Sequence, residues 1–351
     1  MKKIIYLAIF LAAVSLTGVG CITIGPSDGQ GADGGIFKSG DKGVIWAQTN
    51  TVPTAEGIGN INETNIYDIN FDPQDSNAMY LSSAGNGLFY SWDGARSWRY
   101  VDSLGSGYVN SVAIDYKDKC TIFTALQNKI YKSSDCARTW DDTYFDTRAD
   151  IYVSFLAVDP YDSKILYAGL SKGDLLKSID AGVSWSTIHR FNNKVQKIAI
   201  YPTNSNIIFV ALQNDGLWRS NDKGKTWKDL RENMKDFRDS NEIYDIDMTM
   251  DGKNIYLTSK YGITRSKDAG DTWQAIKLLT PERSTRIYAF AVNPNDEKEL
   301  YYSTASTFYS SFDGGSNWVT KKLPTSRVGT ALIVHPKDGN ILYLGTTQFS
   351  K

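Results

Sequence analysis

The residues of this sequence best suited to chemistry are seven aspartates, each at the third position of one recurring octapeptide. The first copy of the octapeptide is SGDKGVIW, beginning at Ser39, and the last is SFDGGSNW, beginning at Ser311. Successive copies begin 42 to 52 residues apart. Carboxylates can act as acids, bases or nucleophiles, but glycosidase-type chemistry needs two carboxylates flanking one bond. Seven equivalent aspartates on a regular repeat instead predict a structural role. The aspartates are Asp41, Asp93, Asp135, Asp180, Asp222, Asp268 and Asp313.

The octapeptide has the composition of a tight turn between two strands. Its serine, aspartate and tryptophan occur in all seven copies. An aspartate side chain accepts hydrogen bonds from backbone N–H groups in a turn, and glycine adopts the positive φ that a reversal requires. The tryptophan then begins the next strand and presents a large apolar face for packing between sheets. Ala95 and Ala137 replace the glycine, and Ile45 and Asn317 replace the usual serine or threonine.

Other reactive residue types are scarce. The two histidines, His189 and His335, lie in different parts of the chain, and there are three cysteines. The sequence therefore has few histidines and cysteines from which to build a zinc site of the usual His/Cys type. We expect no metal and no cofactor. The 38 basic residues balance the 39 acidic residues to a net charge of −1, which argues against a general nucleic-acid binder.

The segments around each octapeptide repeat the same four-strand unit. In the first unit, apolar runs at Ile66–Phe71, Met79–Ser83 and Leu88–Ser91 precede the octapeptide, and residues 98–101 follow it. The later first strands are expected at Val109–Ile114, Val153–Val158, Val195–Ile200, Ile243–Met248 and 287–292. Four strands in each repeat of about 45 residues are typical of β-propeller blades.

The two ends of the repeat region predict how the ring closes. The N-terminal part has room for a third and a fourth strand around the first octapeptide. After the last octapeptide, residues 331–334 and 341–345 supply a first and a second strand. Six whole blades and one composite blade make seven, and closure leaves no open sheet edge. We therefore predict an all-β, seven-bladed β-propeller over residues 35–351, with four antiparallel strands per blade.

The N-terminus carries a predicted export signal. Lys2 and Lys3 precede an apolar run over residues 4–19, so residues 1–20 are interpreted as a signal peptide rather than a membrane span. The small residues before Cys21 resemble a bacterial lipobox, although Gly18 stands where leucine is usual. Residues 21–34 are rich in glycine and predict a flexible linker. We expect a lipid-anchored protein at the periplasmic or extracellular side of the envelope; ordinary cleavage or a retained N-terminal helix is the alternative.

The remaining cysteines, Cys120 and Cys136, are predicted to form a disulfide. Cys120 begins the expected second strand of its blade, and Cys136 lies in the octapeptide at the end of the third. A hairpin centred on Asn128 places the two residues directly opposite each other, at a separation that a disulfide can span. Export to an oxidising compartment permits the bond. Two unpaired thiols are the alternative.

Binding residues are expected on the face of the ring where the first strands begin, opposite the octapeptides. The loops 48–65 and 228–242 are the longest there, and basic side chains near several loops favour an anionic partner. A polar lining of a water-filled channel and an ordinary solvated surface are the alternatives. The candidate residues are Tyr67, Asp68, Asn110, Tyr152, Arg190, Lys194, Gln196, Tyr244, Arg283, Arg286, Tyr288 and Arg327.

The octapeptide resembles the Asp box, S-x-D-x-G-x-[ST]-W, of bacterial sialidases, sortilin-type receptors and related propellers. Sortilin-type receptors have ten blades, which the predicted seven do not match. The repeat architecture is also similar to the photosystem II assembly factors of cyanobacteria and plastids, which are exported seven-bladed propellers and, in cyanobacteria, lipoproteins. This resemblance implies a non-enzymatic binding or assembly role, and we expect a monomer with a protein partner. The arginine-rich patch of those factors cannot be placed on this sequence residue by residue.

Carbohydrate binding or glycoside hydrolysis is the alternative that the Asp box implies. Sialidases have six blades, an arginine triad, a Tyr–Glu nucleophile pair and an Arg-Ile-Pro signature, which is absent here. A triad would have to come from Arg283, Arg286 and Arg327. Xyloglucan-cleaving enzymes use two propellers that face one cleft, whereas this sequence predicts one. We therefore expect a scaffold rather than an enzyme.

Overall fold

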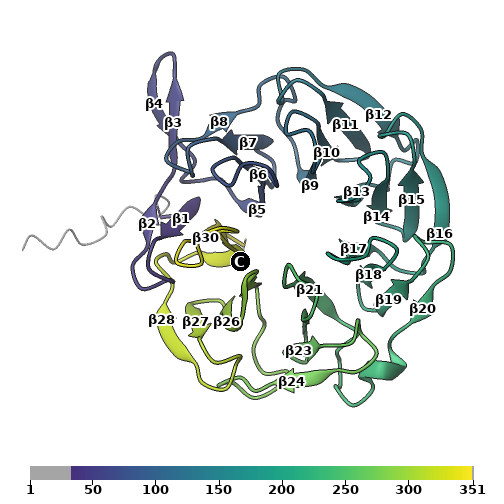
Figure 1. Cartoon of the computed structure of the whole chain (residues 1–351). Coiled ribbons are helices and arrows are strands. Elements are labelled where there is room, and N and C mark those ends of the chain that lie inside the picture. The colour runs from purple at the N-terminus through teal and green to yellow at the C-terminus, as the bar shows by residue number, and fades with distance from the viewer. Residues whose placement is uncertain (1–32, 350–351) are drawn as a thin grey trace, which may run out of the picture. The chain divides into compact units, whose positions relative to one another are not determined.

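The computed structural model describes residues 33–349, which form seven four-stranded antiparallel sheets around a central channel (Figure 1). The first strand of each sheet lines the channel and the fourth lies at the rim. The predicted seven-bladed β-propeller is therefore confirmed. The predicted signal peptide, Cys21 and the linker up to residue 32 lie outside the described residues. Within residues 33–349 no helix is long and apolar enough to cross a membrane.

Six blades follow one another along the chain, each built from four consecutive strands. Blade 1 is β5 (Ile66–Phe71), β6 (Met79–Ser83), β7 (Leu88–Ser91) and β8 (Arg99–Tyr100). Blade 2 is β9 (Val109–Ile114), β10 (Ile122–Leu126), β11 (Lys129–Ser133) and β12 (Asp141–Phe145). Blade 3 is β13 (Val153–Val158), β14 (Leu166–Leu170), β15 (Asp174–Ser178) and β16 (Ser186–Arg190). Blade 4 is β17 (Val195–Ile200), β18 (Ile208–Leu212), β19 (Gly216–Ser220) and β20 (Lys228–Asp229).

Blades 5 and 6 continue the same pattern, and five of the six predicted first strands have the predicted bounds. Blade 5 is β21 (Ile243–Met248), β22 (Ile255–Ser259), β23 (Ile263–Ser266) and β24 (Gln274–Ile276). Blade 6 is β25 (Ala289–Asn293), β26 (Asp296–Ser303), β27 (Thr307–Ser311) and β28 (Val319–Lys322). The first strand of blade 6 was expected over residues 287–292 and begins two residues later.

Blade 7 joins the two ends of the chain, as predicted. Its strands, from the channel outward, are β29 (Val328–Val334), β30 (Leu342–Thr347), β1 (Ile36–Ser39) and β2 (Ala47–Gln48). The antiparallel register pairs Ile36 with Gly345 and Ser39 with Leu342. The loop over residues 48–65 also carries a hairpin, β3 (Thr51–Thr54) and β4 (Gly57–Asn60), outside the ring (Figure 1). The loop over residues 228–242 contains the short 3-10 helix η1 (Glu232–Met234).

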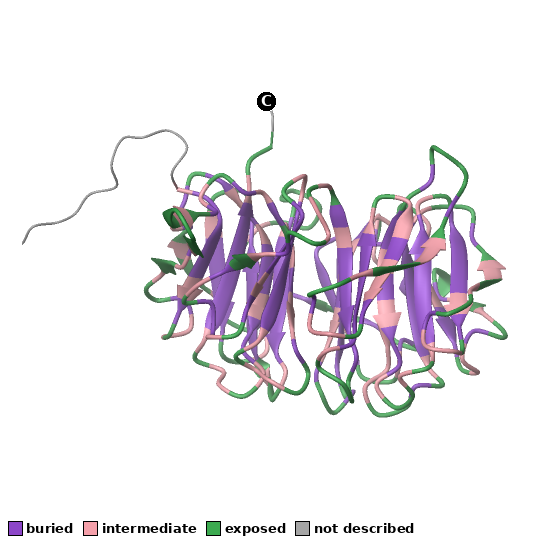
Figure 2. Ribbon diagram, turned by 90° about the horizontal axis from the view of Figure 1, so that it is seen from above, coloured by how far each residue is buried: buried purple, intermediate pink, exposed green. Residues whose placement is uncertain are grey.

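The core lies between the blades. Within the described residues each of seven apolar clusters joins two neighbouring sheets, and Figure 2 shows buried residues along the strands with exposed residues in the loops at both ends. The cluster between blades 7 and 1, for example, contains Ile36, Trp98 and Tyr343, all at most 1% exposed. Because every sheet is covered on both faces, neighbouring blades stabilise one another around the whole ring.

The ring has two faces, which carry different loops. We call the end at which the first strands begin the loop face, and the opposite end the octapeptide face. The octapeptides contact the turns between first and second strands: the N–H of Gly94 donates to the carbonyl of Asn77 (2.9 Å), and the N–H of Ala181 to that of Lys164 (3.0 Å). The octapeptides therefore lie opposite the loop face, as expected.

Candidate functional site

The aspartates of the octapeptides are occupied by hydrogen bonds within their own turns. In blade 1 the Ser91 hydroxyl donates to Asp93 (2.8 Å), which also accepts from the N–H of Ser97 (3.0 Å) and from the Ser97 hydroxyl (2.7 Å). The Ser91 oxygen in turn accepts from the N–H of Ala95 (3.0 Å). All seven octapeptides repeat the bond from the serine to the aspartate. These carboxylates therefore organise the turns of the octapeptides.

The two alanines that replace the turn glycine adopt the conformation that glycine would take. Ala95 has φ of 64° and Ala137 of 65°, close to the 85° of Gly182 in the same position. A side chain pays a steric penalty in this region, so the repeat geometry overrides local preference at both sites. Both alanines are buried, which leaves room for only a small side chain.

A disulfide joins Cys120 to Cys136, whose Cα atoms are 3.9 Å apart. The route by which they meet differs from the one expected. Strands β10 and β11 pair Leu126 with Lys129, so the hairpin is centred between two residues and not on Asn128. Both cysteines lie outside the strands, and the positive φ of Cys136 (62°) in the octapeptide turn brings it beside Cys120. The N–H of Cys136 donates to the carbonyl of Cys120 (3.1 Å).

Four of the candidate tyrosines begin or precede first strands on the loop face: Tyr67, Tyr152, Tyr244 and Tyr288. Tyr67 is 47% exposed and Tyr152 is 37% exposed. Two cations stack on this group. The Arg286 guanidinium lies 4.7 Å from the centre of the Tyr244 ring and 5.3 Å from that of Tyr288, and the Lys194 ammonium lies 5.4 Å from that of Tyr152. We call these six residues the tyrosine–cation group.

One polar candidate, Asn110, has a structural task instead. The first strand of a blade has one edge without a strand partner, and in several blades side chains of the preceding blade bond to its backbone. Asn110 donates to the carbonyl of Val153 (2.9 Å), and Thr330 donates to that of Ile66 (2.9 Å). This supports the alternative of a polar channel lining for Asn110, because a buried backbone carbonyl requires a hydrogen-bond donor. Among the described residues the Gln196 side chain makes no hydrogen bond that would assign it to partner binding or to the channel lining.

Charged side chains meet inside the channel. Lys197 of blade 4 bonds to Asp245 of blade 5. Burial alone would lower the pKa of Lys197, but the charges of Asp245 and of Asp68 in blade 1 outweigh burial and raise it. Burial raises the pKa of Asp68, although Lys197 opposes the shift. Burial and the charge of Asp245 raise the pKa of Asp247 to about 6. Asp245 and Asp247 were not among the predicted binding residues, although their alternation with Tyr244 and Ile246 on a first strand could have indicated that they face the channel.

Three of the candidate arginines do not form a free cationic surface. The Arg327 side chain is buried, bonds to Glu63 (2.5 Å) and lies 4.0 Å from Asp33, so the expectation that it is available to a partner is wrong. Arg283 is paired with Asp239 (2.6 Å). Arg190 is paired with Asp174 (3.0 Å) at the outer end of blade 3. Arg286 therefore has no arginine partners with which to build a carboxylate-binding triad.

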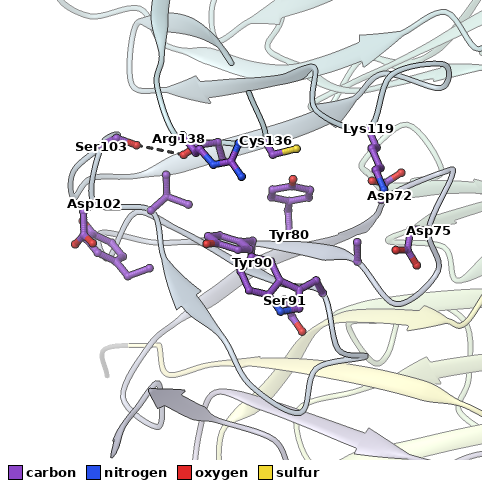
Figure 3. Close-up of a pocket in the computed structure, with 15 residues that line it drawn as sticks. Asp72, Asp75, Tyr80, Tyr90, Ser91, Asp102, Ser103, Lys119, Cys136 and Arg138 are labelled. Carbon is purple, nitrogen blue, oxygen red and sulfur yellow. Dashed lines mark hydrogen bonds between the residues drawn. The ribbon is translucent and has the colours of Figure 1, made fainter. Parts of the chain in front are cut away.

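A cleft of about 530 Å³ opens between blades 1 and 2 and was not expected from the sequence. Figure 3 shows Tyr80 and Tyr90 projecting from blade 1, with Cys136 and Arg138 of blade 2 opposite them. Asp72 is one of the carboxylates that line the cleft, but it already caps the turn after β5 by accepting from the N–H of Gln74 (2.8 Å). We call this feature the blade 1–2 cleft. Among residues 33–349 no group of three or more His, Cys, Asp and Glu side chains is arranged to hold a metal ion.

A second cavity, of about 540 Å³, occupies the octapeptide end of the channel. It is lined mainly by the ends of the first strands of blades 1 to 5, and the lining includes apolar residues such as Phe155 and Met248. Its one lining cation, Lys197, is already paired with Asp245, and most of the remaining lining is apolar. The tyrosine–cation group and the blade 1–2 cleft are therefore the better equipped surfaces.

No protein-family model and no curated protein matches the sequence. Solved structures do share its fold. One is the GH74 xyloglucanase from Xanthomonas campestris, with a TM-score of 0.66, 16% identity, and coverage of 81% of this chain and 51% of that chain. Another is YCF48 bound to a D1 peptide, with a TM-score of 0.61, 16% identity, and coverage of 85% of this chain and 96% of that chain. YCF48 from Cyanidioschyzon merolae has a TM-score of 0.62 at 13% identity, covering 81% and 96%.

The two kinds of neighbour differ in length. This chain spans about half of the GH74 xyloglucanase and nearly all of YCF48. At identities of 13% to 16% these likenesses establish the seven-bladed propeller fold alone. Function has to be argued from the chain's own surfaces, because one fold can support unrelated activities.

Proposed function

We propose that this propeller is a non-enzymatic binding module that holds a segment of a protein partner on the tyrosine–cation group of the loop face. The observation that carries the proposal is that Arg286 and Lys194 stack on tyrosine rings while neither has a carboxylate partner among residues 33–349. Tyrosine rings bury a large area at little entropic cost, and their hydroxyl groups can bond to a peptide backbone.

The charge of the group specifies the partner's chemistry. Two ammonium or guanidinium groups without acidic partners favour a segment that carries carboxylates. Such charges raise the association rate more than they stabilise the final complex. The fold neighbour YCF48 has been captured with a D1 peptide, which supports peptide binding as a use of this architecture. The occupied octapeptide carboxylates argue against hydrolysis.

The test compares charge reversal on the group with charge reversal elsewhere. Arg286→Glu combined with Lys194→Glu should weaken capture of a partner from native membranes, and the loss should shrink at high salt because exposed charges are screened. Lys267→Glu, in an exposed octapeptide turn of blade 5, is the matched control. The captured protein is identified by mass spectrometry and titrated in purified form. Equal affinity of the double variant and the control would refute the assignment of this surface.

Carbohydrate binding is the second candidate function. Exposed aromatic rings are platforms on which sugars stack, and Trp92 beside the blade 1–2 cleft is 55% exposed. Purified protein should nevertheless show no turnover of sialosides or β-glucans at high protein concentration. Turnover that disappears when a carboxylate of the loop face or the cleft is mutated would overturn the binding-module proposal.

We further propose that the protein acts at the cell envelope, exported and held to the membrane through a lipid on Cys21. The proposal rests on the basic, apolar and small-residue pattern of residues 1–21. A lipid anchor would confine the propeller near its partner and raise the partner's effective concentration.

A further inference from the structure

Neighbouring blades are joined by a recurring cation, which we call the interblade cation. It lies on the third strand, immediately before the octapeptide, and donates to the carbonyl of the fourth octapeptide residue of the next blade. The four such bonds are Lys38 to Gly94 (2.9 Å), Lys132 to Ala181 (3.0 Å), Lys177 to Lys223 (2.9 Å) and Arg219 to Ala269 (2.5 Å).

An aromatic ring on the second strand lies under the interblade cation. The ammonium of Lys38 is 5.3 Å from the centre of the Tyr343 ring, and that of Lys177 is 5.3 Å from the Tyr167 ring. Lys132 makes the same contact with a phenylalanine at 5.6 Å. The attraction between a cation and a ring face strengthens when water is excluded, as it is between blades. The interface thus combines a cation, a ring face and a carbonyl oxygen.

Two of the other interfaces also contain a cation. Arg265 occupies the equivalent position in blade 5. Blade 6 has Ser310 there, but Lys42 in the octapeptide of blade 7 supplies the charge: it bonds to Glu299, and its ammonium lies 5.6 Å from the centre of the Phe312 ring.

The interface between blades 1 and 2 departs from this rule. Tyr90 occupies the position of the cation, and the facing octapeptide residue is Cys136, which is tied to Cys120. Within the described chain no hydrogen bond reaches the Cys136 carbonyl, whereas four of its counterparts each accept at least one. The ring below, that of Tyr80, is 7% exposed, while Phe123, Tyr167 and Tyr343 in the same position are at most 1% exposed.

The blade 1–2 cleft lies where the interblade cation is missing. The rings of Tyr80 and Tyr90 have their centres 6.4 Å apart. Trp92 lies 5.0 Å from Tyr90 but already carries the Arg99 guanidinium, 4.8 Å from its ring centre, so the two tyrosine rings are the ones without a cation. Figure 3 shows both tyrosine rings in the cleft, with Cys136 nearby. Asp72, Asp75 and Asp102 line it against Lys119 and Arg138, so the acidic groups outnumber the basic ones. Neither of those cations stacks on Tyr80 or Tyr90 in the described structure.

We propose that the blade 1–2 cleft binds an arginine side chain of a partner polypeptide, which takes the place of the missing interblade cation. Its guanidinium would stack on the tyrosine rings, donate to the Cys136 carbonyl and be neutralised by the carboxylates of the cleft. A planar guanidinium suits this site better than an ammonium because it can stack and donate several hydrogen bonds together. The volume of about 530 Å³ leaves room for residues that flank the arginine.

This site is separate from the tyrosine–cation group, so the two proposals can fail independently. The probe is an acetylated and amidated Gly-Arg-Gly peptide, titrated into the mature protein and followed by backbone amide shifts of blades 1 and 2. The peptide with citrulline in place of arginine has the same shape without the charge. We expect it to bind at least about 10-fold more weakly, the scale of one desolvated cation–π contact.

The decisive variant is Tyr90→Lys, which installs the cation that blades 2, 3 and 7 carry at this position. It should keep or raise the melting temperature and reduce arginine-peptide binding at least about 10-fold, because the cleft then holds its own cation. Tyr90→Phe keeps the ring and should bind as the wild type does. Tyr90→Arg serves as a second replacement if the lysine variant does not fold.

Three results would each overturn the proposal. They are the absence of arginine-peptide binding to the wild type, equal binding of the citrulline peptide, and unchanged binding to a folded Tyr90→Lys or Tyr90→Arg variant. Free arginine amide that binds as tightly as the peptide would indicate a small-molecule site instead of a polypeptide site. A neutral oligosaccharide that binds the wild type and is lost in Tyr90→Lys would assign the cleft to carbohydrate.

Discussion

Removal of the Asp93 carboxylate tests the structural role assigned to the octapeptides. Asp93 accepts from the Ser91 hydroxyl, from the N–H groups of Arg96 (2.9 Å) and Ser97, and from the Ser97 hydroxyl. In Asp93→Ala these donors lose their acceptor. A typical intramolecular hydrogen bond contributes about 1 kcal/mol net. Because the turn is half-exposed and water replaces part of the loss, we expect the free energy of unfolding to fall by roughly 2 kcal/mol.

The assay is denaturant and thermal unfolding followed by tryptophan fluorescence. A loss of roughly 2 kcal/mol corresponds to a melting temperature lower by about 3 °C in a protein of this size, because its entropy of unfolding is large. Arg96→Ala is the control, since this exposed side chain lies in the same turn and the variant keeps the N–H that Asp93 accepts. It should change stability by less than about 0.5 kcal/mol. An Asp93→Ala protein as stable as this control would refute the hydrogen-bond argument.

The same variant has a defined pH signature. Burial would raise the pKa of Asp93, but hydrogen bonds from Ser97, Ser91 and Arg96 outweigh it and hold the pKa below 3.8. A carboxyl whose folded-state pKa is lowered stabilises the fold above its unfolded-state pKa, and this stabilisation is lost as pH falls through the folded-state value. The stability difference between wild type and Asp93→Ala should therefore be constant from about pH 5 to 7 and shrink below about pH 4. A difference that is equally large at pH 3 would contradict this account.

Three further changes probe the anchor, the disulfide and the loop face. Cys21→Ala should move the protein from membranes to the soluble exported fraction, and equal membrane retention would disprove lipidation. Mass spectrometry of unreduced peptides should find Cys120 joined to Cys136, whereas ready alkylation of both without reductant would show free thiols. Arg327→Glu should lower the melting temperature, because it places a buried carboxylate beside Glu63. Arg286→Glu should leave the melting temperature unchanged, because Arg286 is exposed. Equal shifts for the two variants would contradict the assignment of Arg327 as buried and Arg286 as exposed.

The repeat made the architecture predictable. Seven octapeptides with strands at constant offsets specify the blades. Each end of the repeat region supplies only two of the four strands of a blade, which specifies a composite blade made from both ends. Most predicted first strands have the observed bounds, because alternating apolar residues and a following turn mark both ends of a strand. The first strand of blade 7 begins three residues earlier than expected, at Val328, and the first strand of blade 6 begins two residues later than expected. There Arg286 and Ile287 precede the ladder, and pairing begins at Ala289 opposite Ser303.

The candidate site was less predictable because residue type does not reveal a partner that is distant in sequence. Arg327 and Glu63 are 264 positions apart and meet only because the ends of the chain share blade 7. Arg283 and Asp239 meet from neighbouring blades in the same way. An arginine in a loop therefore has the same sequence signature whether it is buried in an ion pair or offered to a partner.

The sequence by itself determined the number of blades, the strands within each blade and the turn function of the seven aspartates, because these depend on local patterns that repeat. It also recorded Tyr90 where five of the other six third strands have lysine or arginine, but that departure had no evident meaning alone. Only the tertiary structure decided its consequence. The ring places this position against the octapeptide of the next blade, where a missing cation leaves a ring face, a carbonyl and three carboxylates around one cleft.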